Sequence, residues 1–393
     1  MQNIVIEKPY VFVPPYHGRL WLACLQLFLR PWLRHEYGVT KLECRGLDHL
    51  RASLQAGHGI LLAPNHCRYS DPFVVGEMAR QAGTLPYTVA SWHLFMQERW
   101  KAWLLRRGGV FSIYREGMDR ASINASVDIL TSAKRPLVLF PEGVMTRTND
   151  RLSPLLEGTT FIARAAAKKR AQATPPGQVV IHPVALRYTF HGDIAQAIGP
   201  ALDDLERRLS WLPQHHLSLL GRVYKLARAL LGLKEIEYLE EPQTGDIYKR
   251  LQRLIDHMLS PIEQEWLKVQ SNGSVVARVK KLRAAILPDM IQGEISEAER
   301  QRRWRQLATL YMAQQLWYYP PDYLTSETQT DRLLETVERF EEDLTDQCRI
   351  YRPMSVTVTV GEAIPVSPTR DRGAAEDPVT AALEASLNKL LGI

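Results

Sequence analysis

Cysteine is scarce in this sequence of 393 residues, and its placement excludes two kinds of site. The four cysteines are Cys24, Cys44, Cys67 and Cys348. They lie far apart and form no C-x-x-C pair, so neither a disulfide framework nor a zinc site is expected. We therefore expect no metal, and a reducing compartment is the simplest interpretation.

Long apolar runs and the signatures of two common enzyme classes are also missing. No stretch of about 18 apolar residues occurs, so no transmembrane helix is predicted. The N-terminal segment MQNIVIEKPYVFVPP lacks a signal-peptide pattern. No G-x-S-x-G elbow is present, which argues against a serine hydrolase. Gly57-His-Gly59 begins like a dinucleotide-binding loop but lacks the third glycine and the helix that should follow.

Internal repeats and low-complexity tracts are not recognised either, and the composition is that of a globular protein. Hydrophobic residues make up 45% of the chain and charged residues 23%. What the composition does show is an excess of one sign of charge, with a formal net charge of +6. This excess favours anionic partners such as lipid headgroups, phosphorylated metabolites or nucleic acid, without choosing among them.

Strand-like and helix-like segments alternate through the first half of the chain. Short apolar runs that are typical of strands occupy residues 41–45, 59–65, 84–90, 109–114, 136–143 and 178–186. Helical patterns separate them. The alternation predicts an α/β fold with a mostly parallel sheet flanked by helices, in which ligands bind at the carboxyl ends of the strands.

The pattern becomes almost wholly helical after Thr189, and a strand pattern returns only at Met354–Val360. Ser296 and Glu299 form a capping box that should open a long helix. The predicted division has four parts, with an all-α insertion before the last strand. These are an N-terminal segment (1–40), an α/β core (41–194), a helical insertion (195–350), and the last strand and C-terminal helix (351–393).

Three amphipathic segments allow two interpretations each. The stretch from Leu20 to His35, with an expected break at Pro31, suits a helix lying in a membrane interface, but an ordinary core helix would look similar. In the insertion, residues 217–233 and 276–287 mix apolar and basic side chains at helical spacing. They could dock on a membrane or form a lid, or belong to a bundle with a solvated basic face.

The segment Asn65-His66-Cys67-Arg68-Tyr69-Ser70-Asp71 pairs an imidazole with a carboxylate between a strand and a helix. A carboxylate beside a histidine fixes its tautomer and lets it deprotonate an alcohol. On a regular helix these two positions lie about 140° apart, so they meet only across a turn. The alternative is that Asp71 only caps the helix predicted from Pro72 to Gln81.

Three further blocks place polar residues at strand ends. Gly109-VFSIY-Arg115 ends one strand with an arginine, and Phe140-Pro141-Glu142-Gly143 ends the next, with Arg147 close behind. The planar fork of arginine suits a phosphate, and Gly143 permits close backbone approach to a ligand. Pro183 falls within the following strand. Each residue alone could equally be a surface charge or a turn residue.

Taken together, these blocks make the sequence resemble the glycerophosphate and lysophosphatidic acid acyltransferases. An NHxxxxD block, a GxFxIxR-like block, an FPEG block and a proline-bearing strand follow in order, and VTVGEAIPV near the end resembles that family's last strand. The resemblance covers roughly residues 40–190 and 354–391. It implies that His66 is the general base and Asp71 its charge partner. It also implies substrate-binding roles for Asn65, Gly109, Arg115, Glu142, Gly143 and Arg147, with Pro183 bordering the acyl-chain pocket.

The implied reaction is direct acyl transfer without a cofactor or metal. His66 would take the proton of an acceptor hydroxyl, which attacks the thioester of acyl-CoA or acyl carrier protein. Backbone N–H groups near the site, such as that of Gly143, would stabilise the oxyanion. Cys67 is not expected to be a nucleophile.

The resemblance also implies a setting and has departures. It points to phospholipid biosynthesis with 1-acylglycerol-3-phosphate as the first acceptor, on the cytoplasmic face of a membrane, with peripheral or monotopic attachment and no nucleic acid. Val144-Met145-Thr146 stands where the family usually has Thr-Arg-Ser, so one phosphate-side arginine is missing. A different lysolipid, an amino-acid-derived lipid, or a non-catalytic membrane-binding scaffold on the same fold are the alternatives.

Overall fold

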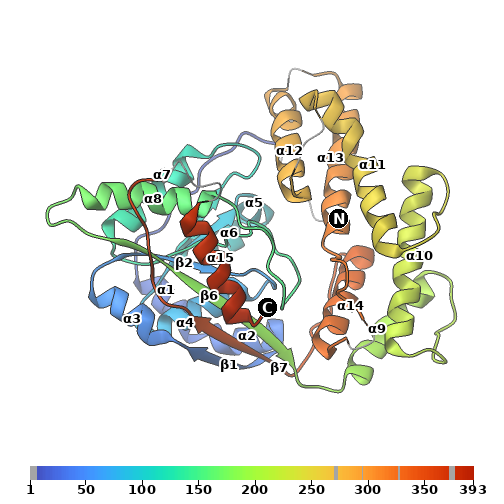
Figure 1. The fold of residues 1–393 in the computed structure, drawn as a ribbon, viewed down its shortest axis with the longest axis horizontal. Helices are drawn as coiled ribbons and strands as arrows, with labels where there is room; N and C mark the ends of the chain where they lie inside the picture. The colour runs from blue at the N-terminus through green and yellow to red at the C-terminus, as the bar shows by residue number, and fades with distance from the viewer. Residues whose placement is uncertain (1–6, 270–272, 294, 326–327, 371–376) are drawn as a thin grey trace. The chain divides into compact units, whose positions relative to one another are not determined.

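The computed structural model (Figure 1) describes residues 7–269, 273–293, 295–325, 328–370 and 377–393. Contacts divide them into two units. The first, which we call the α/β unit, consists of Val11–Tyr114, Met118–Gly192 and Ile350–Ile393. The second, which we call the helical unit, consists of residues 7–10, Arg115–Gly117 and Asp193–Arg349.

The α/β unit is built on one sheet with strand order β1-β7-β6-β2-β5-β3-β4, in which β8 also pairs with β6. The strands are β1 Val39–Arg45, β2 Gly59–Pro64, β3 Tyr87–Ser91, β4 Val110–Ile113, β5 Leu137–Val138, β6 Val179–Phe190, β7 Met354–Val360 and β8 Ile364–Pro365. Strands β6, β2, β5, β3 and β4 are mutually parallel. Strands β7 and β8 run antiparallel to β6. The prediction of a mixed α/β fold with a mostly parallel sheet is confirmed.

Helices cover both faces of this sheet (Figure 1). The helices of the unit are α1 Leu20–Leu27, α2 Leu29–Tyr37, α3 Leu47–Gln55, α4 Asp71–Gln81, α5 His93–Gln97, α6 Arg99–Arg107, α7 Arg120–Ser132, α8 Gly158–Ala171 and α15 Pro378–Leu391. On one face, apolar side chains of α7, α8 and α15 form a hydrophobic core with Leu61, Ala63 and Ile181 of the central strands. A bidentate ion pair between Arg164 and Asp377 ties α8 to the start of α15.

Two predicted helices differ from the structure, each at a break. The helix from Leu20 to His35 is interrupted at Phe28 rather than at Pro31. Pro31 is the third residue of α2, where it has no intrahelical N–H bond to lose, so it is tolerated. The helical pattern between the predicted strands 84–90 and 109–114 is split at Glu98, which has an extended backbone.

The described part of the helical unit contains helices and no strand. They are α9 Ile194–Arg208, α10 Leu219–Leu239, α11 Ile247–Leu267, α12 Val275–Gln292, α13 Glu297–Trp317 and α14 Thr330–Thr345. Ser296 caps α13 as predicted, because its Oγ accepts the N–H of Glu299 at 3.2 Å. Two arginines in the segments predicted to be amphipathic, Arg222 and Arg278, are buried rather than part of a solvated basic face.

The helical unit contains an internal repeat, so the prediction of a sequence without repeats is wrong. Ser218-LLGRVYKL, Asp246-IYKRLQRL and Ser274-VVARVKKL open α10, α11 and α12 at intervals of 28 residues, from 218 to 246 to 274. In each, the first side chain accepts an N–H three residues on. The leucine that ends each segment is fully buried, at 0% exposed. The shared residues therefore have shared structural roles.

The fifth position of each repeat is an arginine that pairs with a buried glutamate of the preceding helix. Arg222 pairs with Glu206, and Arg250 pairs with Glu235. Arg278 pairs with Glu263 in the same way, through Nε and Nη2 at 2.8 and 3.0 Å. We call these pairs the Arg–Glu clamps, since each joins one helix to the next.

Candidate active site

The two blocks with the clearest chemistry meet at one edge of the α/β sheet. His66 follows the carboxyl end of β2, and Phe140–Gly143 follow the carboxyl end of β5. Strands β2 and β5 are parallel neighbours, so their carboxyl ends lie side by side.

His66 and Asp71 are in direct contact across the turn, as predicted. His66 Nδ1 lies 2.9 Å from Asp71 Oδ2. A carboxylate can only accept, so Nδ1 carries the proton and Nε2 keeps its lone pair. The His66 side chain is 20% exposed and the Asp71 side chain 0%, which gives a base that a substrate can reach and a partner that water cannot.

Asp71 does not act as the cap of α4, which was the alternative interpretation. The helix begins at Asp71 itself, after Ser70, and no side chain caps its N-terminus. Instead Asp71 Oδ2 accepts the backbone N–H groups of Cys67 and Arg68, at 2.7 and 2.8 Å. The carboxylate therefore stabilises the turn between residues 66 and 71. This turn places the His66 ring in contact with Asp71 Oδ2.

Tyr188 is a member of the site that sequence reasoning missed. It is buried in β6, and its hydroxyl donates to Asp71 Oδ1 at 2.7 Å and lies 2.9 Å from Ser70 Oγ. Burial, and then the Asp71 charge, raise the pKa of Tyr188 well above its usual value, so the hydroxyl stays a donor. The available signal was a tyrosine in an otherwise apolar strand, because a buried hydroxyl requires a partner.

Glu142 holds the backbone of His66 rather than facing open space. It is 2% exposed; its Oε1 accepts the His66 N–H at 2.7 Å, and its Oε2 accepts the Ser153 N–H at 2.8 Å. Burial raises the pKa of Glu142 to about 8 against the opposing effect of these two N–H donors. The structure thus places Glu142 as a positioning residue, and its predicted substrate contact remains a prediction.

The segment after β5 encloses His66 from a second side. The Phe140 ring stacks on the His66 ring, with centroids 4.1 Å apart. Thr146 donates its N–H to the carbonyl of His66 at 2.8 Å. Arg147, the next residue, has its guanidinium 4.6 Å from the centre of the Tyr69 ring and is 8% exposed. The predicted Arg147 is therefore brought close to the His66 turn.

Two asparagine side chains join the loops after β2 and β5 to β6. Each side-chain amide makes two hydrogen bonds with the backbone of one β6 residue, as a neighbouring strand would. Asn65 Oδ1 accepts the Leu186 N–H and its Nδ2 donates to the Leu186 carbonyl, at 2.7 and 3.1 Å. Asn149 makes the corresponding pair of bonds with the backbone of Tyr188. Asn65 was predicted to bind substrate, but the structure gives its amide this structural role.

The two predicted glycines have backbone roles that differ from those expected. Gly143 has φ +71°, and an added Cβ would lie 2.3 Å from Leu156. Its N–H donates to the Phe140 carbonyl at 3.1 Å, so it closes a turn and is not directed at an oxyanion. Gly109 lies at the amino end of β4, the opposite sheet edge from His66. Its φ of +83° and the guanidinium of Arg135 explain the glycine there, and a substrate contact is not supported.

The remaining predicted residues lie in different surroundings. Pro183 is buried in β6, between the residues paired with β8 and those paired with β7, where a missing N–H breaks no bond of either pair. It is in register with Ala63, two residues before Asn65. Arg115 groups with the helical unit. The acyl-pocket role of Pro183 and the phosphate role of Arg115 remain predictions.

Comparison with known proteins supports the chemistry of this geometry. Residues 41–187 match the family model described as Acyltransferase. The matched stretch includes the His66–Asp71 turn and the segment after β5, and it supports a general acyltransferase function, with an acyl donor and a lipid acceptor. No curated protein sequence matches the chain.

Proposed function

We propose that this chain transfers a fatty acyl group from an acyl-CoA or acyl carrier protein thioester to the hydroxyl of a glycerol-phosphate-type lipid, with His66 as general base. The single observation that carries the proposal is the contact between His66 and the buried Asp71. The family match to residues 41–187 supports acyl transfer as the reaction class. The first acceptor we propose is 1-acylglycerol-3-phosphate, in phospholipid biosynthesis.

In the proposed mechanism, His66 Nε2 takes the proton of the acceptor hydroxyl as its oxygen attacks the thioester carbonyl. Asp71 stabilises the imidazolium that forms, because its carboxylate stays in contact with Nδ1. The tetrahedral intermediate then collapses, the C–S bond breaks, and the leaving thiolate receives the proton from His66. No acyl-enzyme forms. Cys67 is 1% exposed, and its Sγ lies 3.9 Å from Asp71 Oδ1, a position unsuited to attack on a substrate.

The acceptor's phosphate is the part of the proposal that rests on arginines. Arg147 lies next to the residue that binds the His66 carbonyl, and Arg115 comes shortly after β4. A guanidinium binds a phosphate through two parallel N–H bonds. Met145, where the family usually has an arginine, favours a second candidate: acylation of a different lysolipid or of an amino-acid-derived lipid.

The reaction is tested with purified protein, labelled acyl-CoA and a panel of lysolipids, followed by lipid mass spectrometry. We expect one acylated product class from the native chain and none from His66→Ala, since general base catalysis is lost. Circular dichroism should show that His66→Ala stays folded. Full turnover by His66→Ala would exclude the mechanism.

The membrane surface is proposed from a group of exposed aromatic and aliphatic side chains on α1, α2 and α6. Leu20 and Leu27 are each 76% exposed, Phe28 70% and Trp100 58%. Trp21 and Trp103 meet edge to face at 5.2 Å and so join α1 to α6. No helix within the described residues is both long and apolar enough to cross a bilayer.

Exposed arginines accompany this group, among them Arg19, Arg34, Arg99 and Arg106. Aromatic side chains with basic neighbours are typical of helices that lie in an anionic interface. We propose peripheral or monotopic attachment to the cytoplasmic face of a membrane. The double variant Phe28→Ser, Trp100→Ser should reduce sedimentation with anionic vesicles by roughly tenfold or more. Unchanged sedimentation would contradict this surface and would indicate that the helical unit binds the membrane instead.

A further inference from the structure

The carboxyl end of β6 has a strand neighbour on only one of its edges. Strand β7 pairs with this end of β6, whereas β2 ends at Pro64, opposite Val184. Beyond Val184 the second edge of β6 needs other partners, because unpaired N–H and C=O groups of a mostly buried strand are costly. Asn149 supplies them at Tyr188: its Oδ1 accepts the Tyr188 N–H at 2.7 Å, and its Nδ2 donates to the Tyr188 carbonyl. The backbone of Tyr188 is therefore fixed from both edges of β6.

The Tyr188 side chain continues this connection to the pair formed by His66 and Asp71. Tyr188 is 1% exposed, and its hydroxyl donates to Asp71 Oδ1 at 2.7 Å. The other carboxylate oxygen, Asp71 Oδ2, lies 2.9 Å from His66 Nδ1. The carboxylate is thus held by Tyr188 on one oxygen and faces His66 with the other. A shift of the Tyr188 backbone would withdraw the hydroxyl and let the carboxylate turn.

The loop segment that carries Asn149 also binds the backbone of His66. Thr146 donates its N–H and its Oγ1 hydroxyl to the His66 carbonyl, at 2.8 and 3.1 Å. Three residues later, Asn149 binds β6. Arg147, between them, has a left-handed backbone with φ +57°, which a residue other than glycine adopts only where its surroundings enforce it. The segment is therefore held at both ends, and it connects His66 to the strand that orients its carboxylate partner.

We propose that Asn149 is a positioning residue for acyl transfer. By fixing the Tyr188 backbone, it keeps the Tyr188 hydroxyl on Asp71 and so keeps the carboxylate aligned with His66 Nδ1. The proposal requires that Asn149 acts through Tyr188 and not by a route of its own. The link to a reaction rests on the proposed function, whereas the contact between Asp71 and His66 can be measured without turnover.

A double-mutant cycle between Asn149→Ala and Tyr188→Phe tests this route on the whole chain. Each single variant should lower kcat by roughly 3–10-fold and leave KM for acyl-CoA and for the lysolipid acceptor within about twofold. Because both changes remove the same hydrogen bond from Asp71, kcat of the double variant should lie within about twofold of the slower single variant. Effects on kcat that multiply in the double variant would overturn the route through Tyr188. An unchanged kcat in Asn149→Ala would overturn the positioning role itself.

The first control, Asn65→Ala, removes the same kind of bond pair from Leu186. The Leu186 side chain is apolar and cannot donate to a carboxylate, so the effects of Asn65→Ala and Tyr188→Phe on kcat should multiply. Equal coupling of Asn65 and of Asn149 to Tyr188 would mean that β6 as a whole is disturbed. That result would overturn the specific role of Asn149.

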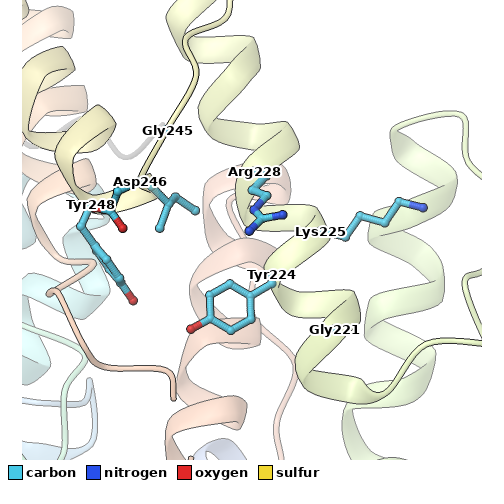
Figure 2. A pocket seen from close by; sticks show the side chains of 8 residues that line it. Gly221, Tyr224, Lys225, Arg228, Gly245, Asp246 and Tyr248 are labelled. Atoms are coloured by element: carbon cyan, nitrogen blue, oxygen red, sulfur yellow. The ribbon is translucent and has the colours of Figure 1, made fainter. Parts of the chain in front are cut away.

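The second control, Tyr224→Phe, removes a tyrosine hydroxyl from the helical unit. Tyr224 donates to the carbonyl of Leu324 and lines an open pocket with Arg228 and Tyr248 (Figure 2). This variant should leave kcat within about twofold of the native chain, as expected for a hydrogen bond outside the site. An equal loss of kcat in Tyr224→Phe and Asn149→Ala would mean general damage to the fold and would overturn the proposal.

Proton NMR of the chain with nitrogen-15-labelled histidine measures the contact between Asp71 and His66 without turnover. The His66 signals are those absent from His66→Ala. A proton shared with a carboxylate resonates downfield, so the Nδ1–H signal should move upfield in Asn149→Ala and in Tyr188→Phe, and no further in the double variant. If Asn149→Ala does not fold, Asn149→Asp replaces it, because its carboxylate keeps the acceptor for the Tyr188 N–H and loses the donor to the Tyr188 carbonyl.

The NMR result separates the two proposals. An unchanged Nδ1–H signal of His66 in a folded Asn149 variant would overturn the positioning role. A chain that shows the upfield shift but transfers no acyl group in its native form would refute the proposed function and leave standing the role of Asn149 in aligning Asp71 with His66.

Discussion

The α/β unit and the helical unit bury carboxylates in opposite ways. In the α/β unit, Asp71 and Glu142 accept hydrogen bonds from backbone N–H groups, an imidazole and a hydroxyl. In the helical unit, Glu206, Glu235 and Glu263 each face an arginine of the next helix. In the first arrangement the carboxylate can stabilise a positive charge that appears on its neighbour, such as a protonated imidazole. In the second arrangement the carboxylate faces an arginine that is always charged.

The pKa values follow this difference. Burial raises the pKa of Glu142 to about 8, because no full positive charge opposes it. Burial would also raise the pKa of Glu235, but hydrogen bonds from Arg250 and from the Gln243 N–H hold it below its ordinary value. A carboxylate near a proton-transfer residue and a carboxylate in a structural pair are therefore distinguished by the partner's charge rather than by burial.

The largest expected effect is on catalysis, from Asp71→Asn. An amide in place of the carboxylate removes the acceptor that fixes the His66 tautomer, so kcat should fall about 10³–10⁴-fold. Steady-state kinetics check this. Asp128→Asn, an exposed carboxylate of the same unit, is the control and should stay within about twofold of the native chain. A small effect of Asp71→Asn would mean that the turn, and not the charge, is what matters.

The Arg–Glu clamps should affect stability and not chemistry. Arg250→Met strands Glu235 as a buried unpaired charge and should lower the free energy of unfolding by about 3–5 kcal/mol. Adding Glu235→Gln removes that charge while keeping an acceptor for the Gln243 N–H, so most of the loss should be recovered. Urea denaturation of the native chain, the single and the double variant measures this. A double variant no more stable than Arg250→Met would show that the unpaired charge of Glu235 is not the cause of the loss.

Glu142 should make stability depend on pH. Its pKa rises from 4.5 to about 8 on folding, so the native state holds an extra proton between these values. Stability from this group therefore falls as pH rises from about 4.5 to 8, and the loss is complete above 8. Glu142→Gln should flatten this slope, which is on the order of a few kcal/mol in total. Urea denaturation at pH 5, 6.5 and 8 tests it, with the exposed Glu241→Gln as a control that keeps the native slope.

Tyr188→Phe should give the smallest of these effects. Asp71 keeps its bonds to His66 and to the turn but loses the donor that orients its second oxygen, so kcat should fall by less than about tenfold. The loss of one buried hydrogen bond should cost about 1 kcal/mol of stability. Tyr224→Phe, whose hydroxyl donates to a backbone carbonyl of the helical unit, should leave kcat unchanged. An unchanged kcat in Tyr188→Phe would mean that Tyr188 is only a packing residue.

Local patterns predicted the parts of the fold and site that local geometry determines. The alternation from Met354 to Val360 gave the strand with both ends correct, and the spacing of His66 and Asp71 required a turn that is present. Tyr188 could not be found this way, since β6 reaches Asp71 only through tertiary packing. The position of Gly109 at the amino end of β4 could not be predicted, because an apolar run marks a strand but not which of its ends lies near the ligand.

The helical unit was harder to predict because its information is spread between helices. The arginines of the clamps look like part of a basic helix face in one helix, and only the contact with the previous helix shows that they are buried. The repeat shares few residue types per segment, and the segments between them vary in sequence. In the sequence Arg283 is one more basic residue of a basic stretch, and only the structure shows that its Nε and Nη2 are buried with no hydrogen-bond partner among the described residues.

Because each Arg–Glu clamp lies at the same place in its repeat, a whole repeat can be removed or duplicated without leaving an unpaired clamp residue. Each clamp joins the end of one helix to the start of the next, and Glu235 stands as far before Arg250 as Glu263 stands before Arg278. Removing residues 246–273 would bring Glu235 to that same separation from Arg278, with Ser274 taking over the cap of Asp246. Duplication of such a segment adds a helix together with the Arg–Glu clamp that joins it to the preceding helix.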